Sequence, residues 1–139
     1  MPDLYYLPQT GDDLDEIDIA AMREPSYTWK VNAEGERVTG MTDLADALRQ
    51  AVYHILSVER YRYVIYPRSY GSEIADLIGK AQDYAAAELQ RTITEALIQD
   101  DRVTFVGDFS FEYPKGTVVA TFTVETIYGE LEIQGELTR

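Results

Sequence analysis

The chain has 139 residues and a mass of 15.8 kDa, a size that one hydrophobic core serves, so we expect a single folded domain. Its 25 acidic and 12 basic residues give a formal net charge of −13, which disfavours nucleic-acid and anionic-membrane partners. With no cysteine and one histidine, His54, it has no disulfide, no thiol nucleophile and no multi-histidine metal site. No stretch approaches the ~20 apolar residues of a membrane helix, and we expect a soluble product made in a cytoplasm.

Residues 1–25 are predicted to be an acidic, flexible N-terminal arm. They contain seven acidic residues and one basic residue, so they hold −6 of the formal charge, and Pro2, Pro8 and Gly11 interrupt any regular element. The apolar patch Leu4-Tyr5-Tyr6-Leu7 is unusual for a solubility tail. Two alternatives stay open for this patch: it docks on a partner, or it packs back on its own domain.

A small hairpin and a helix open the folded part, which we expect to span 26–139. Apolar and polar residues alternate from Tyr27 to Val31, and 32–35 has turn composition before the second strand at 37–39. Thr42 is the predicted N-cap of a first helix over 43–57. Apolar residues recur in it at helical spacing, at Leu44, Leu48, Val52, Ile55 and Leu56.

Three further elements are expected before residue 100. The β-branched and aromatic run 60–66 predicts a strand that Pro67 ends. A short helix is expected from about Ser72, with Gly79 just past its end. Asp83 is the predicted N-cap of a long amphipathic helix over 84–98. The apolar stripe of that helix consists of Ala86, Leu89, Ile93, Ala96 and Leu97.

The C-terminal part has the pattern of an antiparallel β meander. A strand from Val103 to Tyr113 is interrupted at 107–108 as by a bulge, and 114–116 turns the chain into a second strand over 117–128. A reversal at 128–130 leads into the last strand. The helix over 84–98 is the expected cover of one face. The predicted fold class is therefore α+β: two layers, with a small N-terminal hairpin, helices, and a C-terminal meander packed by the long helix.

Acidic residues are so abundant that pairs resembling a catalytic dyad arise by chance. Asp100, Asp101, Glu73 and Asp108 can each be nominated for a glycosidase, but a dyad depends on a spatial separation and a raised pKa that sequence does not reveal. The acidic run 12–18 fails the EF-hand pattern, which needs glycine at its sixth position. We therefore expect no catalytic residue, no bound metal and no cofactor.

His54 and the tyrosines near it have two interpretations each. His54 has no acid or second histidine at a ligand spacing, so a structural or surface role is expected rather than a catalytic one. The run from Arg60 to Arg68 mixes arginines with tyrosines like a small single-strand nucleic-acid platform. Against the acidic background of the chain, packing or protein contact is the favoured interpretation.

The middle of the chain resembles a known family. The run AVYHILSVERY at 51–61, then YPRSYGSE at 66–73 and Leu77-Ile78, resembles the small baseplate wedge proteins of contractile phage tails, historically called tail-lysozyme-like. The similarity is to the version found in defective prophages of Gram-positive bacteria, and the order of elements matches from about residue 42 to 137. Two positions depart: Asp100-Asp101-Arg102 stands where the family has Glu-Pro-Arg, and Val58 stands where it has glycine.

The resemblance implies a non-enzymatic baseplate component that links the wedge to the first sheath ring. It implies contact with larger wedge proteins through the acidic-Arg region, and a sheet edge related to the one by which sheath subunits interlock. Tube or hub proteins are further candidate partners, and the implied location is the virion tail baseplate, assembled in the bacterial host cytoplasm. The expected interface residues are Arg102, Asp100, Asp101, Pro67, Arg68 and Gly71.

Alternatives stay open at this point. Arg102 is suited to a bidentate carboxylate contact across an interface, but it can also cap the preceding helix or pair with Asp100 within the chain. For the whole protein, the rivals are a peptidoglycan-cleaving glycosidase, as the old family name suggests, and an acidic decoy that mimics nucleic acid.

Overall fold

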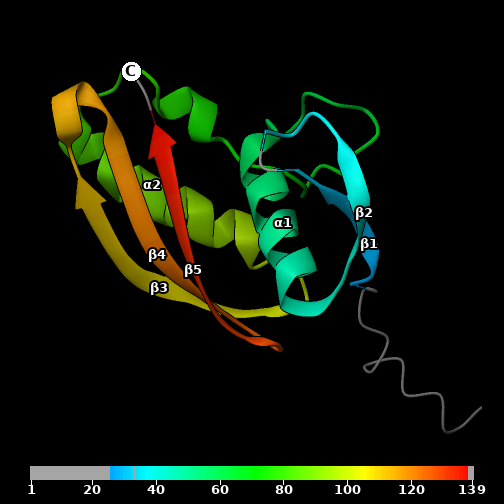
Figure 1. The fold of residues 1–139 in the computed structure, drawn as a ribbon. Coiled ribbons are helices and arrows are strands. Elements are labelled where there is room, and N and C mark those ends of the chain that lie inside the picture. Colours follow the sequence, from blue (N-terminus) through cyan, green and yellow to red (C-terminus); the bar gives the residue numbers. More distant parts are fainter. Residues whose placement is uncertain (1–25, 33, 138–139) are drawn as a thin grey trace, which may run out of the picture.

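The computed structural model describes residues 26–32 and 34–137, so the predicted arm at 1–25 lies outside the described part. A two-stranded antiparallel sheet, β1–β2, and a three-stranded antiparallel sheet in the order β3–β4–β5 accompany two helices (Figure 1). The predicted α+β class is confirmed. The elements are β1 Thr28–Val31, β2 Val38–Thr42, α1 Leu44–Ser57, the 3₁₀ turn η3 Ile74–Leu77, α2 Gln82–Leu97, β3 Val103–Glu112, the 3₁₀ turn η4 Pro114–Gly116, β4 Val118–Thr126 and β5 Gly129–Leu137.

The core lies between α2, α1 and the inner face of the three-stranded sheet. Figure 1 shows α2 running behind the meander, as the amphipathic pattern predicted. All five residues of its predicted stripe are buried, and Phe122 on the central strand β4 is 1% exposed. Because full burial of a Leu, Ile or Phe side chain contributes about 1.5–3 kcal/mol, this face stabilises the packing of the helix on the sheet.

Both helices begin differently from the sequence prediction. Thr42 is not the N-cap of α1 but the last residue of β2, and the Asp43 carboxylate caps the helix by accepting the N–H of Leu44 and the Ser26 hydroxyl. Leu44 has a φ of 54° and is 56% exposed, so it stands outside the buried stripe of the helix. In α2, Asp83 is not the cap either. It lies in the first turn, where a negative charge favours the helix dipole.

The predicted strand at 60–66 is wrong. The segment is a series of turns, with Tyr61 at a φ of 69°, and an isolated parallel bridge between Glu59 and Ser72 closes it. Val64 is 101% exposed and Ile65 is 83% exposed, so neither has the neighbouring strand or covered face that β propensity presupposes. Strand propensity is overridden here, because the segment pairs with none of the described strands.

The meander follows the prediction closely. The β3–β4 register shifts between Gly107 and Ser110, which confirms the bulge, and 114–116 turns the chain as expected. The β4–β5 pairing runs without a shift from Thr126 opposite Gly129 to Val118 opposite Leu137. No helix in the described part of the chain is long and apolar enough to cross a membrane.

Candidate protein interface at the Asp100–Arg102 turn

A tight turn joins α2 to β3 and carries three of the six predicted interface residues, Asp100, Asp101 and Arg102. The N–H of Asp100 donates to the carbonyl of Leu97, and the N–H of Val103 donates to the carbonyl of Asp100. The carbonyl of Arg102 accepts from Ile127 N–H at 3.1 Å, which ties the turn to the β4–β5 reversal. The backbone of the turn is therefore held both by the end of α2 and by the sheet.

Asp100 and Arg102 form a buried, bidentate ion pair. Arg102 Nε donates to Asp100 Oδ1 at 2.9 Å and Arg102 Nη2 donates to Oδ2 at 2.7 Å, while the Arg102 N–H donates to Oδ1 at 3.0 Å. Both side chains are 10% exposed. Of the alternatives that the sequence left open for Arg102, the pairing with Asp100 within the chain is therefore formed. A partner that contacts this turn meets the ion pair and not a free guanidinium.

The pair stays charged. Burial alone raises the pKa of Asp100, but the hydrogen bonds from the Arg102 guanidinium and N–H outweigh it and hold that pKa below its ordinary value. The hydrogen bond to Asp100 likewise raises the pKa of Arg102. These two parallel hydrogen bonds between the guanidinium and the carboxylate, a charge-assisted fork, fix the shape of the turn as well as its charge.

The turn lines a cavity of about 530 Å³ together with the segment after the aromatic run. Asp100, Asp101 and Arg102 are among its lining residues from the turn, and Pro67 and Tyr70 are among those from the other segment. Four of the six predicted interface residues are therefore brought together from two separate stretches of the chain. Tyr70, which the prediction did not single out, is half-buried here, and burial raises the pKa of its hydroxyl.

Arg68 and Gly71 do not line this cavity. Arg68 is exposed and has no ion-pair partner among residues 26–32 and 34–137. Gly71 has a structural role instead, because its φ is +91° and a Cβ there would lie 2.6 Å from the carbonyl oxygen of Val58. Only glycine fits this close approach of two chain segments.

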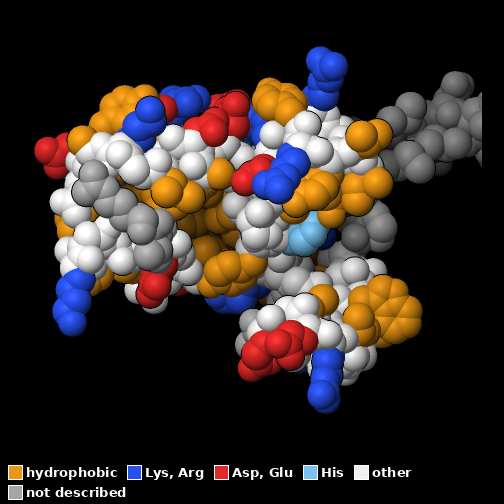
Figure 2. Space-filling view, turned by 90° about the horizontal axis from the view of Figure 1, so that it is seen from above, with side chains coloured by type: hydrophobic (Ala, Val, Ile, Leu, Met, Phe, Trp, Pro, Cys, Tyr) orange, Lys and Arg blue, Asp and Glu red, His pale blue; other side chains and the backbone are white. Residues whose placement is uncertain are grey.

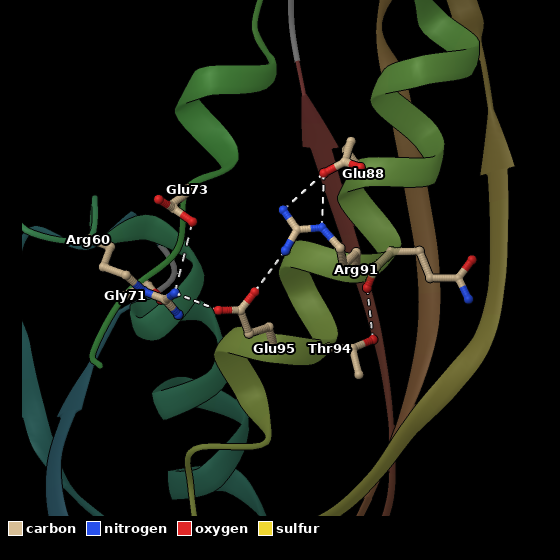
Figure 3. A network of polar contacts seen from close by, with 8 residues as sticks. Arg60, Gly71, Glu73, Glu88, Arg91, Thr94 and Glu95 are labelled. Carbon is tan, nitrogen blue, oxygen red and sulfur yellow. Dashed lines mark hydrogen bonds and ion pairs between the residues drawn. The ribbon is translucent and has the colours of Figure 1, made fainter. Parts of the chain in front are cut away.

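Arg60 is a buried anchor that the sequence did not indicate. Its side chain is 7% exposed, Nη1 lies 3.0 Å from a Glu95 oxygen and 4.0 Å from Glu73, and Nη2 donates to the Gly71 carbonyl at 3.2 Å (Figure 3). Arg91 joins the same network through Glu88 and Glu95. The network fastens the turn-rich segment to α2. The sequence did not indicate this role of Arg60, because the residue lies in a run with the composition of a strand.

The aromatic segment packs around His54 instead of forming a platform. Tyr66 and Tyr70 stack with ring centroids 4.6 Å apart, and their hydroxyls lie 3.3 Å from Nε2 and 2.5 Å from Nδ1 of His54, respectively. These contacts agree with the structural or surface role expected for the histidine. Tyr61 is 67% exposed.

The nominated carboxylates do not combine into a dyad. Both oxygens of Asp100 are engaged by Arg102, and a lowered pKa is the opposite of what a general acid needs. Glu73 lines a different cavity, with Lys80 and Arg91, and Asp108 lies at the β3 bulge. In the described part of the chain, no group of three or more potential ligand side chains could hold a metal ion.

Helix α1 lies between the two sheets and covers one edge of each. Gln50 donates from Nε2 to the Trp29 carbonyl at 2.8 Å and accepts the Val31 N–H at 3.0 Å, so its amide satisfies the outer edge of β1. On the other side, Arg49 donates to the Glu132 carbonyl on β5 at 2.8 Å. Tyr53 reaches the next outward carbonyl of that strand, that of Gln134, at 3.5 Å. Beyond it the outer edge of β5 is open in the described structure.

Comparison with known proteins gives the family context of these features. The family model of contractile injection system sheath initiators matches residues 27–129. The phage-like element PBSX protein XkdS of Bacillus subtilis (strain 168) is 40% identical over 116 residues, which cover 80% of this chain and 82% of that protein. The resemblance to a contractile-tail family of a phage-like element is thereby confirmed. The chain belongs to the contractile injection system sheath initiator family, whose members are structural components of contractile phage-type tails.

Proposed function

We propose that the chain is a non-enzymatic component of a tail baseplate, a wedge protein that joins the baseplate to the first ring of the sheath. Family membership supports the sheath side of the proposal. The observation that carries it is the outer edge of β5, which is regular and which α1 leaves open beyond Gln134. Its register with β4 is unbroken, whereas β3 at the opposite edge is bulged, and a bulge discourages strand addition. A regular edge accepts a partner strand through backbone hydrogen bonds.

A proline substitution at Glu136 tests the sheath contact. The carbonyls of Glu132 and Gln134 point away from β4 toward α1, and every second residue of a strand repeats this direction. The Glu136 N–H therefore also points away from β4, and Glu136→Pro removes no bond within the sheet. Size exclusion with the cognate sheath subunit should show co-elution for wild type and its loss for Glu136→Pro.

The matched control for this experiment is Glu136→Ala. It removes the same carboxylate as the proline variant but keeps the backbone N–H, so it should still co-elute with the sheath subunit. Equal binding by both variants would show that β5 is not the edge used.

The Asp100–Arg102 cavity is the proposed contact with the larger wedge proteins. A buried fork holds the turn in one shape, and the exposed Arg68 adjoins Pro67 at the cavity wall, which suits contact with an acidic surface. Arg68→Glu should abolish co-elution with the large wedge subunit without changing the melting temperature. Lys115→Glu, the same charge change at the β3–β4 turn, should leave co-elution unchanged. Loss in both variants would point to net charge rather than to this surface.

The remaining features fit a part of a larger assembly. In this proposal 26–139 is one folded domain and the acidic residues 1–25 are a tether that meets a basic surface of the tail, on a wedge, tube or hub protein. The protein would act in the virion tail baseplate after assembly in the host cytoplasm. A turbidity assay on cell walls should show no clearing. Sustained clearing that disappears in Asp100→Asn would instead establish a glycosidase.

A further inference from the structure

A hollow lies beneath the open part of the β5 edge. It has a volume of about 220 Å³ and lies between α1, α2 and the inner face of β4 and β5. Figure 2 shows it as a recess lined by hydrophobic side chains. The apolar residues that form most of its wall include Tyr53, Leu56, Ile74, Leu89, Ile93 and Val118.

Gly135 is the reason that this hollow reaches the edge of the sheet. The inward-facing positions of β5 are Leu131, Ile133, Gly135 and Leu137, and the first two are buried in the core. A Cβ built at Gly135 meets no atom within 4 Å. At Gly135, therefore, β5 has no side chain to fill the space between the sheet and the helices. This position lies beside the part of the β5 edge that α1 leaves open.

The size and lining of the hollow define what fits it. A cavity of about 150 Å³ lined by aliphatic and aromatic residues accommodates a benzene molecule, so 220 Å³ suffices for one large apolar side chain. A strand added to the edge projects alternate side chains inward, and one of them would point into the hollow. The hollow therefore has the place and the chemistry of a specificity pocket for an added strand.

The outer face of β5 indicates which residues of the added strand would flank the apolar one. Glu130, Glu132 and Glu136 are exposed on this face, and none has an ion-pair partner among the described residues. Cross-strand neighbours of opposite charge are favourable, whereas like charges directly opposite are destabilising. An incoming strand is thus favoured when its outward positions carry Lys or Arg.

We propose that the hollow at Gly135 receives a large apolar side chain from an extended partner segment, in which that residue alternates with Lys or Arg, added along β5. This rests on the proposed sheath contact and specifies its sequence requirement: apolar inward, basic outward. The 3.5 Å contact of Tyr53 with the Gln134 carbonyl is at the limit of a hydrogen bond and is the contact that the segment displaces, whereas the 2.8 Å hydrogen bond from Arg49 to the Glu132 carbonyl stays and marks where the added segment ends.

Gly135→Leu tests the proposal because it fills the hollow from within. Wild type should bind benzene in solution through this hollow. The variant should keep or raise the melting temperature, show no benzene binding, and bind the cognate sheath subunit about 30-fold more weakly or worse, the effect of a lost apolar anchor. Gln134→Leu adds the same side chain one residue away on the outer face and should bind like wild type. Glu132→Lys with Glu136→Lys should also weaken binding, most strongly at low salt.

The outcomes separate this inference from the function on which it rests. If wild type binds the sheath subunit and Gly135→Leu binds equally well while excluding benzene, the pocket is wrong and the sheath contact stands. If Gln134→Leu loses as much affinity as Gly135→Leu, the inward pocket is likewise overturned. If wild type does not bind the sheath subunit, the proposed function itself fails.

Discussion

Arg102 shows how one buried side chain can define a turn. The guanidinium makes two hydrogen bonds to Asp100, so Arg102→Ala leaves a carboxylate that is 10% exposed without its partner. Breaking such a buried pair costs about 3–5 kcal/mol, and urea denaturation should show a loss of stability in that range. Arg102→Lys keeps the charge but not the fork and should lose less. A loss below about 1 kcal/mol for Arg102→Ala would mean that the pair is solvated.

The same pair predicts an acid-dependent loss of stability. The folded state holds the pKa of Asp100 below its ordinary value of 3.8, so the unfolded chain binds a proton there more readily. The ionised Asp100 therefore contributes its full stabilisation of the folded state at pH values above the pKa of the unfolded chain. This contribution decreases as the pH falls below about 4 and is lost once the pH passes below the pKa of Asp100 in the folded state. The difference in unfolding free energy between wild type and Asp100→Asn should shrink over this window. A difference that does not change with pH would contradict the assignment.

At the scale of elements, the segment 58–72 is held by close backbone approach rather than by strand pairing. Gly71 has a φ of +91° and would place a Cβ 2.6 Å from the Val58 carbonyl, while Gly79 has a φ of +85° and open space around it. Gly79→Ala should cost about 1–2 kcal/mol for its left-handed backbone. Gly71→Ala should cost about 1–3 kcal/mol more, because the segment must also shift. Equal melting temperatures for the two variants would refute this interpretation of Gly71.

One side chain of α1, Gln50, fastens the hairpin to the helix. Since β1 and β2 pair only with each other among the described strands and two-stranded sheets are marginal in water, the two hydrogen bonds that join the Gln50 amide to β1 stabilise the hairpin against α1. Gln50→Leu removes two hydrogen bonds worth about 1 kcal/mol each. Amide exchange in β1 and β2 should then accelerate by about 10-fold or more, with the meander unchanged. Gln50→Glu keeps the acceptor for Val31 and should have a smaller effect.

The sequence predicted the helices and strands that bury one face. It did not predict the segments whose structure depends on contacts between residues far apart in the chain. The stripe of α2 and the alternation in β4 follow from periodicity, because burial selects the same residue types wherever a face is covered. The segment 60–66 has strand composition, but its structure depends on the Arg60 anchor and on Gly71, which are long-range features. At the site, family resemblance indicated the Asp100–Arg102 turn. Neither Tyr70 nor the hollow at Gly135 has a local sequence signal, because each arises where distant segments meet.

On the scale of the whole molecule, charge is unevenly distributed. Residues 1–25 carry −6 of the net −13, which leaves −7 for residues 26–139. A high local charge at one end of a chain acts over about a Debye length, roughly 8 Å at physiological salt, and affects the rate of encounter more than the strength of the final contact. The proposed tether should therefore speed assembly with a basic surface of the tail.

Neutralising part of the N-terminal segment tests this role. Changing Asp12, Asp13 and Asp15 to Asn should slow association with the large wedge subunit by about 10-fold at low salt, because electrostatic steering raises on-rates by roughly 10 to 1,000-fold. The dissociation rate should stay nearly constant, and the effect should vanish at high salt. The control removes three exposed acids of the body, Asp76, Glu112 and Glu125, and should change the rate far less. The association rates are measured by stopped-flow mixing. Equal slowing by both triple variants would show that net charge alone sets the rate, and it would contradict the proposed tether.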